Sequence, residues 1–200
     1  ADGDHLTGLI PTVERYSVGQ VLQPFDMGNS PLAKAWEQAL EEAQLEPMSA
    51  EAGMLIAIEP SLQLEVLNPP KTLVASNMDQ NQRSVALRGN LGDFTFVLTG
   101  DIDQEVEQRL LRDQESLKAT VLKVAHHGAA TSSCESFVRA VDPQVALISV
   151  GSDNSFGHPD PAVTSRLIEA GSLVYRTDRQ GTIEIISDGS QLWVDAGPVW

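Results

Sequence analysis

The sequence has a single cysteine, Cys134, so no internal disulfide can form. A lone free cysteine is usually a buried side chain, and we expect Cys134 to be one. Long apolar runs are also missing, because none approaches the roughly 20 residues that a membrane-spanning helix needs. We therefore expect no membrane segment and one soluble α/β domain over residues 1–200, whose 42% apolar content is enough for a sizeable core.

Basic residues are scarce. Only 13 lysines and arginines stand against 28 acidic residues, which gives a formal net charge of −15. Proteins that bind nucleic acid without sequence preference are usually basic, because phosphate contacts supply most of that affinity. A polyanionic substrate would have to be held here by metal cations and by local basic residues, for which Arg83, Lys123 and Arg176 are the candidates.

Hydrophobic periodicity divides the chain into two parts. In the first part, spacings of three and four residues and a proline at a helix start predict helices over 6–13 and 31–43. Alternation predicts antiparallel strands at 54–58, 62–67, 84–88 and 94–98, with the last two joined by a turn over 89–93. A short strand over 19–22 and a loop over 68–81 complete this part.

The second part begins with a helix that ends near residue 112. From residue 118 onward the predicted strands alternate with helices, in the order strand 119–124, helix 134–140, strand 145–150, helix 161–170 and strand 172–176. This order indicates parallel β-α-β units. A last hairpin is predicted at 181–186 and 191–194, around Asp188-Gly189. The whole pattern indicates mixed sheets with helices on the outside.

Histidine is rare, and its positions are informative. The four histidines are His5, His126, His127 and His158. Each is expected at a strand end or a turn, and none within a helical face. A metal site needs its ligands on such segments, because they converge from loops on a rigid scaffold. The sequence therefore predicts a convergence of histidines around the run that ends in His126-His127-Gly128.

Four segments carry the candidate chemistry: Asp2-Gly3-Asp4-His5, Thr99-Gly100-Asp101, His126-His127-Gly128 and Gly157-His158-Pro159. Each also has a structural interpretation, since Asp101 could cap a helix and Gly157-His158-Pro159 could be a simple turn. Adjacent imidazoles repel one another when both are protonated, which favours deprotonated rings that bind a metal or a substrate. Together the four segments predict a metal-dependent site.

These segments also carry a resemblance. Asp2-x-Asp4-His5 resembles the second half of the His-x-His/Asp-x-Asp-His signature of metallo-β-lactamase-fold enzymes. The order of four segments is similar to the C-terminal domain of the ComEC family of DNA-uptake channel proteins: Leu98-Thr-Gly-Asp101, Val121-Leu-Lys-Val-x-His126-His127-Gly128, Pro143-x-Val-Ala-x-Ile-Ser149 and Asn154-x-x-Gly157-His158-Pro159. The likeness covers essentially the whole chain.

The resemblance implies an αββα sandwich that hydrolyses phosphodiesters with two divalent ions, manganese or zinc, with magnesium as a further candidate. By position, Asp4, His5 and His158 would hold one ion and Asp101 would bridge both. Asp2 would belong to the other ion, together with a histidine upstream of Ala1. His126 and His127 would be catalytic, as proton donors or phosphate contacts. The expected substrate contacts are Asn81, Ser84, Gly128, Ser132 and Ser133.

The implied task is degradation of one DNA strand during uptake, with single-stranded DNA as substrate. The parent would be a bacterial inner-membrane channel protein, from which this domain would project as a soluble, monomeric extracytoplasmic unit. The chain starts without methionine or signal peptide, so we expect a cut that removes the first strands and a ligand, leaving weak metal binding and little activity. Two alternatives stay open: a catalytically silent module that binds DNA or partners, and a small-molecule metallohydrolase of the lactamase or thioesterase type.

Overall fold

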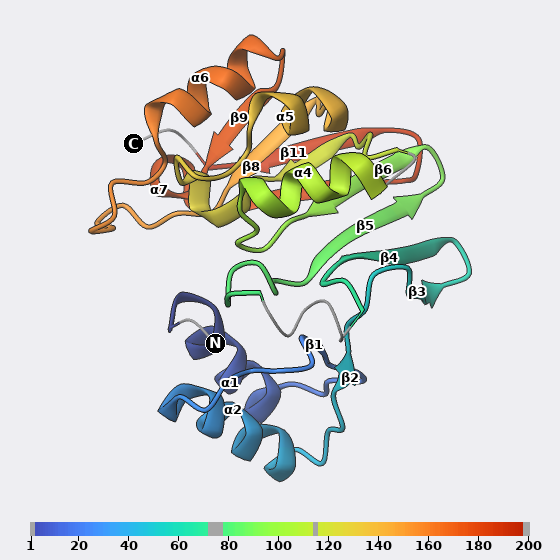
Figure 1. Ribbon diagram of the computed structural model, residues 1–200. Coiled ribbons are helices and arrows are strands. Elements are labelled where there is room, and N and C mark those ends of the chain that lie inside the picture. The colour runs from blue at the N-terminus through green and yellow to red at the C-terminus, as the bar shows by residue number, and fades with distance from the viewer. Residues whose placement is uncertain (1–2, 72–77, 114–115, 198–200) are drawn as a thin grey trace.

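The computed structural model describes residues 3–71, 78–113 and 116–197. Its centre is a mixed sheet of seven strands in the order β3-β4-β5-β6-β7-β8-β9 (Figure 1). These strands are β3 (Leu55–Glu59), β4 (Leu62–Asn68), β5 (Ala86–Leu91), β6 (Phe94–Leu98), β7 (Val121–Lys123), β8 (Val145–Ile148) and β9 (Leu173–Arg176). The strands from β3 to β6 pair antiparallel, and those from β6 to β9 pair parallel. The expected mixed α/β architecture is confirmed.

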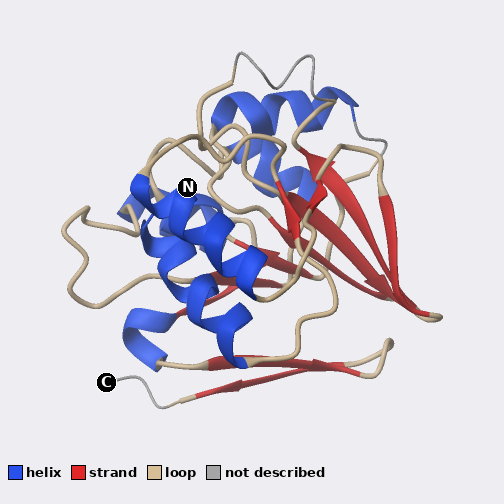
Figure 2. Ribbon diagram, turned by 90° about the horizontal axis from the view of Figure 1, so that it is seen from below, coloured by secondary structure: helices blue, strands red, loops and turns tan. Residues whose placement is uncertain are grey.

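Three helices cover one face of this sheet: α4 (Gln104–Asp113), α5 (Glu135–Val141) and α6 (Pro161–Glu169). Their apolar side chains join those of the parallel strands in the main core, where Leu122, Phe137 and Leu167 are fully buried. A separate hairpin of β10 (Ile183–Ser187) and β11 (Leu192–Ala196) lies on the side of the sheet opposite to α4 (Figure 2). The parallel strands are thus covered on both faces, as buried parallel strands require.

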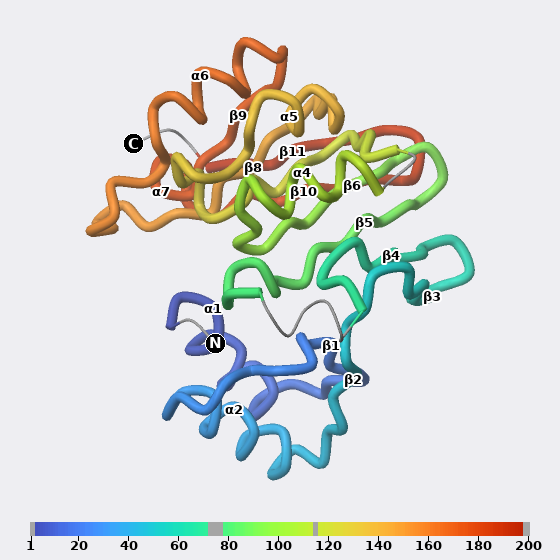
Figure 3. Tube along the Cα trace, in the orientation of Figure 1, coloured from blue at the N-terminus to red at the C-terminus, as the bar shows by residue number. Residues whose placement is uncertain are grey.

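The N-terminal part packs around a second, smaller core. It contains α1 (Gly3–Arg15), α2 (Pro31–Glu42) and the two-residue strands β1 (Leu22–Gln23) and β2 (Met48–Ser49). Ser30 caps α2 by accepting a hydrogen bond from the backbone N–H of Ala33, and Pro31 occupies the first turn. Trp36 of α2 is almost fully buried between the helices. In Figure 3 the start of α1 lies next to the segment that precedes β5, where Arg83 forms an ion pair with Asp26.

Most predicted elements are present, with shifted ends. The structure corrects the following details. His5 lies in the first turn of α1 and not at a strand end or turn. Residues Gly89 to Leu91 belong to β5, so the turn contains only Gly92 and Asp93. The strand expected over 19–22 is reduced to Leu22–Gln23, while β2 and α7 (Thr177–Gln180) were not predicted.

The remaining expectations concern Cys134, the loop over 68–81, membrane-spanning helices and the number of domains. Cys134 is only partly buried, because its Sγ lies near the Nε2 of Gln108 and the Oγ of Ser136 at the surface. Part of the loop predicted over 68–81, residues 72–77, lies outside the described residues. Among the described helices, none has both the length and the hydropathy to cross a membrane. That the chain is one domain stays a prediction.

Candidate metal centre

The carboxyl ends of neighbouring parallel strands bring the predicted site residues together. Asp101 follows β6, the 3-10 helix η1 (Ala125–Gly128) follows β7, and Ser149 follows β8. Because β6, β7 and β8 are parallel neighbours, these segments meet at one edge of the sheet. Ligand sites in such sheets lie in the crevice outside the strand ends. The first turn of α1 adds Asp4 and His5 from the N-terminal part.

The backbone of η1 has an unusual conformation at both histidines. His126 has φ 49° and His127 has φ 54°, and Gly128 continues with φ 82°. Left-handed conformations are uncommon outside glycine, although histidine is among the residues enriched there. The backbone N–H of His126 donates to the carbonyl of Gly100 at 3.1 Å, which ties η1 to the segment after β6. Such conformations concentrate at functional sites.

Four side chains form one cluster with metal-ligating atoms, which we call the His/Asp cluster: Asp4, His5, Asp101 and His127. One ligand atom from each lies within 4.8 Å of all the others. His5 Nε2 is 2.9 Å from Asp101 Oδ2, and His127 Nε2 is 3.1 Å from Asp4 Oδ2 and 3.7 Å from Asp101 Oδ1. Two imidazoles and two carboxylates without a thiolate suit zinc, manganese and other divalent ions.

Two polar atoms of the cluster lack hydrogen-bond partners in the described part of the chain, which leaves them available to a metal ion. Asp101 Oδ1 and His127 Nε2 are both buried, and neither has a hydrogen-bond partner among the described residues. The approach of His127 to Asp4 is close but does not have hydrogen-bond geometry. Leaving two such atoms buried and unpaired costs free energy, whereas a divalent ion between them would satisfy both. The residues therefore fit a cation.

The partners of Asp101 set its charge and its position. Burial alone would raise the pKa of this carboxyl, but the hydrogen bond from His5 and the positive charges of His5 and His127 bring it below its ordinary value. The same hydrogen bond raises the pKa of His5, against the effect of burial. The backbone N–H of Asp101 donates to Ser84 Oγ at 3.1 Å, which fixes the segment after β6. Asp101 is therefore held as a carboxylate.

His158 and His126 lie beside the His/Asp cluster but not in it. Their rings are 5.9 Å apart between centroids, and the His126 ring is 6.4 Å from that of His127. His126 Nδ1 is buried without a hydrogen-bond partner among the described residues. Of the predicted ligands, Asp4, His5 and Asp101 are brought together, His127 completes the cluster where His158 was expected, and Asp2 lies outside the described residues.

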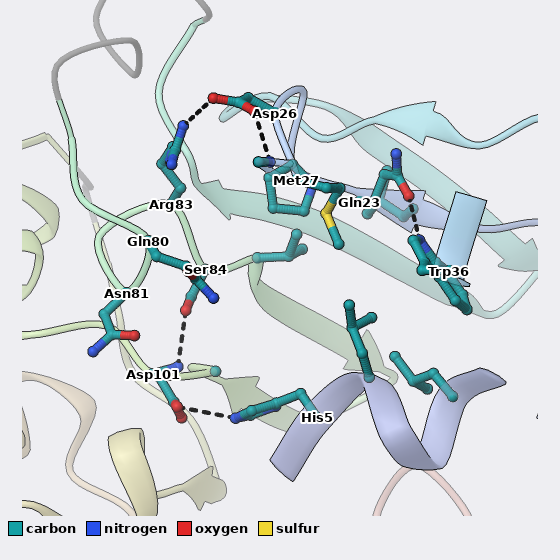
Figure 4. Close-up of a pocket in the computed structure, with 17 residues that line it drawn as sticks. His5, Gln23, Asp26, Met27, Trp36, Gln80, Asn81, Arg83, Ser84 and Asp101 are labelled. Atoms are coloured by element: carbon teal, nitrogen blue, oxygen red, sulfur yellow. Dashed lines mark hydrogen bonds and ion pairs between the residues drawn. The ribbon is translucent and has the colours of Figure 1, made fainter. Parts of the chain in front are cut away.

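Two cavities border the His/Asp cluster, one lined by His5 and Asp101 and the other by Asp4 and His127. The first, the Trp36 cavity, has about 270 Å³ and includes His5, Asp101, Trp36, Arg83 and the predicted substrate residues Asn81 and Ser84 (Figure 4). The second, the Phe156 cavity, has about 390 Å³ and is lined by Asp4, His127, Ser149, Val150, Gly151, Asn154, Phe156, His158 and Thr177. The cluster therefore lies where two binding spaces meet.

Three other predicted substrate contacts lie in places that packing of the chain explains. Ser132 and Ser133 are buried and line neither cavity, and the hydroxyl of Ser132 donates to the carbonyl of Ala125 at 2.9 Å. At Gly128, an added Cβ would lie 2.6 Å from Pro159 Cβ, so this glycine permits close packing of the chain against itself. The structure thus offers a packing reason for Gly128 and leaves its substrate role a prediction.

Of the three basic candidates, only Arg83 reaches a cavity at the cluster. Lys123 Nζ donates to the carbonyl of Val124 at 2.9 Å, and burial lowers the pKa of this amine. Arg176 donates to both carboxylate oxygens of Asp178. Arg83 lines the Trp36 cavity, with Nη1 paired to Asp26 and its buried Nε without a partner in the described part of the chain.

Sequence reasoning missed three contributors to this site. Ser149 supplies a backbone carbonyl, which accepts a 2.7 Å hydrogen bond from His127 Nδ1. Trp36 borders one cavity and Phe156 the other. Ser149 and Phe156 lie within motifs named from the sequence, so their segments carried a signal that could have found them. Trp36 lies on the apolar face of a predicted helix, a pattern that predicts only a core residue.

Comparison with known proteins places these observations in a family context. No protein-family model matches the chain. It is 32% identical over 184 residues to ComE operon protein 3 of Bacillus subtilis, covering 92% of this chain and 23% of that protein. It is 37% identical over 109 residues to competence protein ComA of Neisseria gonorrhoeae, covering 54% of this chain and 16% of that protein. The chain thus spans less than a quarter of either relative.

Fold and site define a mixed α/β protein whose central sheet presents a His/Asp cluster suited to a metal ion. The chain is homologous to the ComEC/ComA competence proteins over most of its length, which confirms the resemblance of its motifs. CmlA, a diiron β-hydroxylase of Streptomyces venezuelae, has a similar fold, with a TM-score of 0.51 and 11% identity over 80% of this chain and 38% of that chain. At that identity the likeness concerns the fold alone.

Proposed function

We propose that the chain is a metallo-β-lactamase-like αββα domain that hydrolyses phosphodiester bonds of DNA with divalent metal ions. The observation that carries this proposal is the His/Asp cluster, which borders two cavities and in which two buried atoms, Asp101 Oδ1 and His127 Nε2, have no hydrogen-bond partner among the described residues. Homology to competence proteins supports DNA as the substrate. The proposed setting is an extracytoplasmic domain of a larger membrane channel protein, monomeric when separated from it.

The proposed function assigns the binding of cations to particular residues. Asp4, His5, Asp101 and His127 would hold one cation, and Asp2 is the proposed contributor to a second ion. A bound divalent ion supplies charge neutralisation for a phosphodiester and lowers the pKa of a water molecule. The chain itself has a net charge of −15, so without cations it would repel that substrate.

We propose that two further groups act on the substrate. His126 has an unpaired Nδ1 beside the cluster and is the proposed proton donor to the leaving oxygen. Arg83 has an unpaired Nε at the Trp36 cavity and is the proposed phosphate contact, together with Asn81. Manganese and zinc are the proposed ions, with magnesium as a further candidate.

A catalytically silent module that binds DNA or a partner is the second candidate function. The strongly acidic composition favours the partner-binding form of this module, because a protein that acts on DNA usually attracts this polyanion. A small-molecule hydrolase is the third, supported by the partly apolar Trp36 cavity. The three candidate functions predict different outcomes for the same cluster: cleavage of DNA, binding without cleavage, or hydrolysis of a small molecule.

The decisive experiment offers the metal-loaded protein several substrates. The chain, and a form extended upstream of Ala1, are loaded with Mn²⁺ or Zn²⁺ and incubated with single-stranded DNA, duplex DNA and a chromogenic β-lactam. We expect cleavage of single-stranded DNA that is lost in Asp101→Asn and kept in Asp142→Asn, whose carboxylate pairs with Lys118 far from the cluster. Metal binding without cleavage of DNA by either form would overturn the proposal.

A further inference from the structure

Phe156 has an exposed ring at the edge of the site. Its side chain is 77% exposed, the highest value among the large hydrophobic residues that the structure describes. One face of the ring stacks on His158, with centroids 5.8 Å apart and planes inclined by 15°. Because only one face of the ring is covered and the side chain is so exposed, the other face of the ring is open to solvent. What distinguishes Phe156 from other exposed apolar residues such as Leu55 is that its ring stacks on His158 and lines a cavity at the His/Asp cluster.

The loop that carries Phe156 is fixed by its own side chains. Asn154 Oδ1 accepts a 2.9 Å hydrogen bond from the backbone N–H of His158. Asn154 Nδ2 donates to the carbonyls of Gly151 and His158, each at 2.9 Å. These bonds close the loop across Phe156, so the backbone that carries the ring is fixed, and the ring itself rests on His158. Little conformational entropy is then lost when a ligand stacks on the ring.

The ring and the His/Asp cluster share one cavity. Asp4 and His127 of the cluster line the Phe156 cavity together with Phe156 and His158. The rings of Phe156, His158 and His126 form a row with centroid spacings of 5.8 and 5.9 Å. A phosphodiester at the cluster would therefore have its neighbouring nucleoside within reach of the Phe156 ring.

Two of the polar side chains that line this cavity, Asn154 and Thr177, are already engaged with the chain. Asn154 closes its own loop, and Thr177 Oγ1 donates to the carbonyl of Val150 at 2.8 Å while accepting from its N–H at 2.7 Å. They are not free to read the hydrogen-bonding edge of a base. Recognition in the cavity would rest on the π-face, which every base has, and would be tolerant of sequence.

We propose that Phe156 is a stacking platform for an unpaired nucleobase next to the scissile phosphodiester, and that the Phe156 cavity is the subsite for it. This rests on the proposed nuclease function and narrows it to single strands, because bases within a duplex are already paired and stacked. The platform would bind the substrate through the base, whereas ions at the His/Asp cluster would bind it through the phosphodiester.

Binding measurements separate the platform from catalysis. Fluorescence anisotropy is recorded at low ionic strength, in EDTA and in Ca²⁺, for a labelled oligothymidylate and for an abasic sugar-phosphate strand of equal length. The variants are Phe156→Leu, which keeps an apolar side chain without a π-face, and Phe156→Trp, which enlarges the ring. Leu55→Ala on β3 is the control, because Leu55 is 71% exposed and lines neither cavity.

We expect Phe156→Leu to weaken binding of oligothymidylate by on the order of tenfold and Phe156→Trp to preserve or strengthen it. Binding of the abasic strand and the behaviour of Leu55→Ala should not change. Equal affinity of wild type and Phe156→Leu for oligothymidylate, an equal loss for the abasic strand, or no binding of oligothymidylate by wild type in Ca²⁺ would each overturn the platform. Phe156-dependent binding without cleavage would support it while rejecting the nuclease activity.

Discussion

His127 Nδ1 donates a 2.7 Å hydrogen bond to the backbone carbonyl of Ser149. A carbonyl oxygen can only accept, so Nδ1 carries a proton. Whenever the ring is neutral, its lone pair is therefore on Nε2, which faces Asp4 and Asp101. His127 follows β7 and Ser149 follows β8, and these strands are neighbours in the sheet. The orientation of the proposed ligand is thus a consequence of strand pairing, which no side-chain substitution at residue 149 would remove.

Replacement of His127 should weaken metal binding far more than replacement of His158. His127→Asn removes the Nε2 ligand and keeps a residue that tolerates the left-handed backbone, so we expect affinity for Zn²⁺ to fall by about 100-fold or more. His158→Ala should cost less than about tenfold, because His158 is outside the His/Asp cluster. Competition with a chelating dye measures both. The opposite order would restore His158 as the ligand, as its motif predicts.

Divalent ions should stabilise the fold through Asp101. At an ion concentration of about 100 times the dissociation constant, linkage gives roughly 2.7 kcal/mol, or about 5–10 °C in Tm for a chain of this length. Asp101→Asn keeps the shape of the side chain and removes its charge, so the shift should disappear. Asp142→Asn should retain it, because Asp142 is an exposed residue with φ 49°, a conformation that asparagine adopts readily. Differential scanning fluorimetry with and without Mn²⁺ measures the shift, and an undiminished shift in Asp101→Asn would contradict the assignment.

The fold was predictable where local pattern and burial agree. The strands around Val121 and Val145 are short apolar runs separated by a helical pattern, and they pair in parallel as expected. The pairing of Leu22–Gln23 with Met48–Ser49 was not predictable, because a strand of two residues has no periodicity and depends on the packing of α1 and α2. The same holds for α7, a single turn after β9.

At the candidate site, the sequence predicted which residues take part, but it did not predict how their side chains are oriented. Asp4, His5 and Asp101 were assigned to a metal from their motifs, and the structure places them together. His126 and His127 are adjacent, and the sequence does not distinguish them. In the structure both have positive φ angles, and His127 alone of the two belongs to the His/Asp cluster. The exposure of Phe156 likewise depends on tertiary structure, since a phenylalanine in a sequence predicts burial.

Glu107 should make stability depend on pH. It is fully buried on α4 and accepts hydrogen bonds from the backbone N–H groups of Ser133 and Cys134. Burial raises the pKa of Glu107 above its ordinary value of 4.5, so the folded state binds its proton more tightly than the unfolded state does. Stability therefore falls as the pH rises from about 4.5 through the raised pKa, where the carboxyl becomes charged in a buried position.

Glu107→Gln removes this dependence, because an amide has no proton to lose. We expect the stability of wild type relative to Glu107→Gln to decrease between about pH 4.5 and neutrality, measured by urea unfolding. Glu105→Gln is the control, since Glu105 is an exposed glutamate on the same helix. A difference between wild type and Glu107→Gln that is constant with pH would show that the buried carboxylate is charged at no cost.

Gly128 should be needed for stability and for the geometry of the His/Asp cluster at once. Its φ of 82° disfavours any side chain, and a Cβ would meet Pro159 Cβ at 2.6 Å, so Gly128→Ala must displace either η1 or the segment after His158. We expect a loss of about 2–3 kcal/mol in the free energy of unfolding, from strain and overpacking together, and weaker Zn²⁺ binding, because His127 precedes the displaced residue. Gly151→Ala is the matched control, since no atom lies within 4 Å of the Cβ it would add and its φ is not in the left-handed range. If Gly128→Ala lost stability but kept full metal affinity, η1 would hold His127 independently of its packing on Pro159, and the hydrogen bond to Ser149 would be sufficient to orient the ligand.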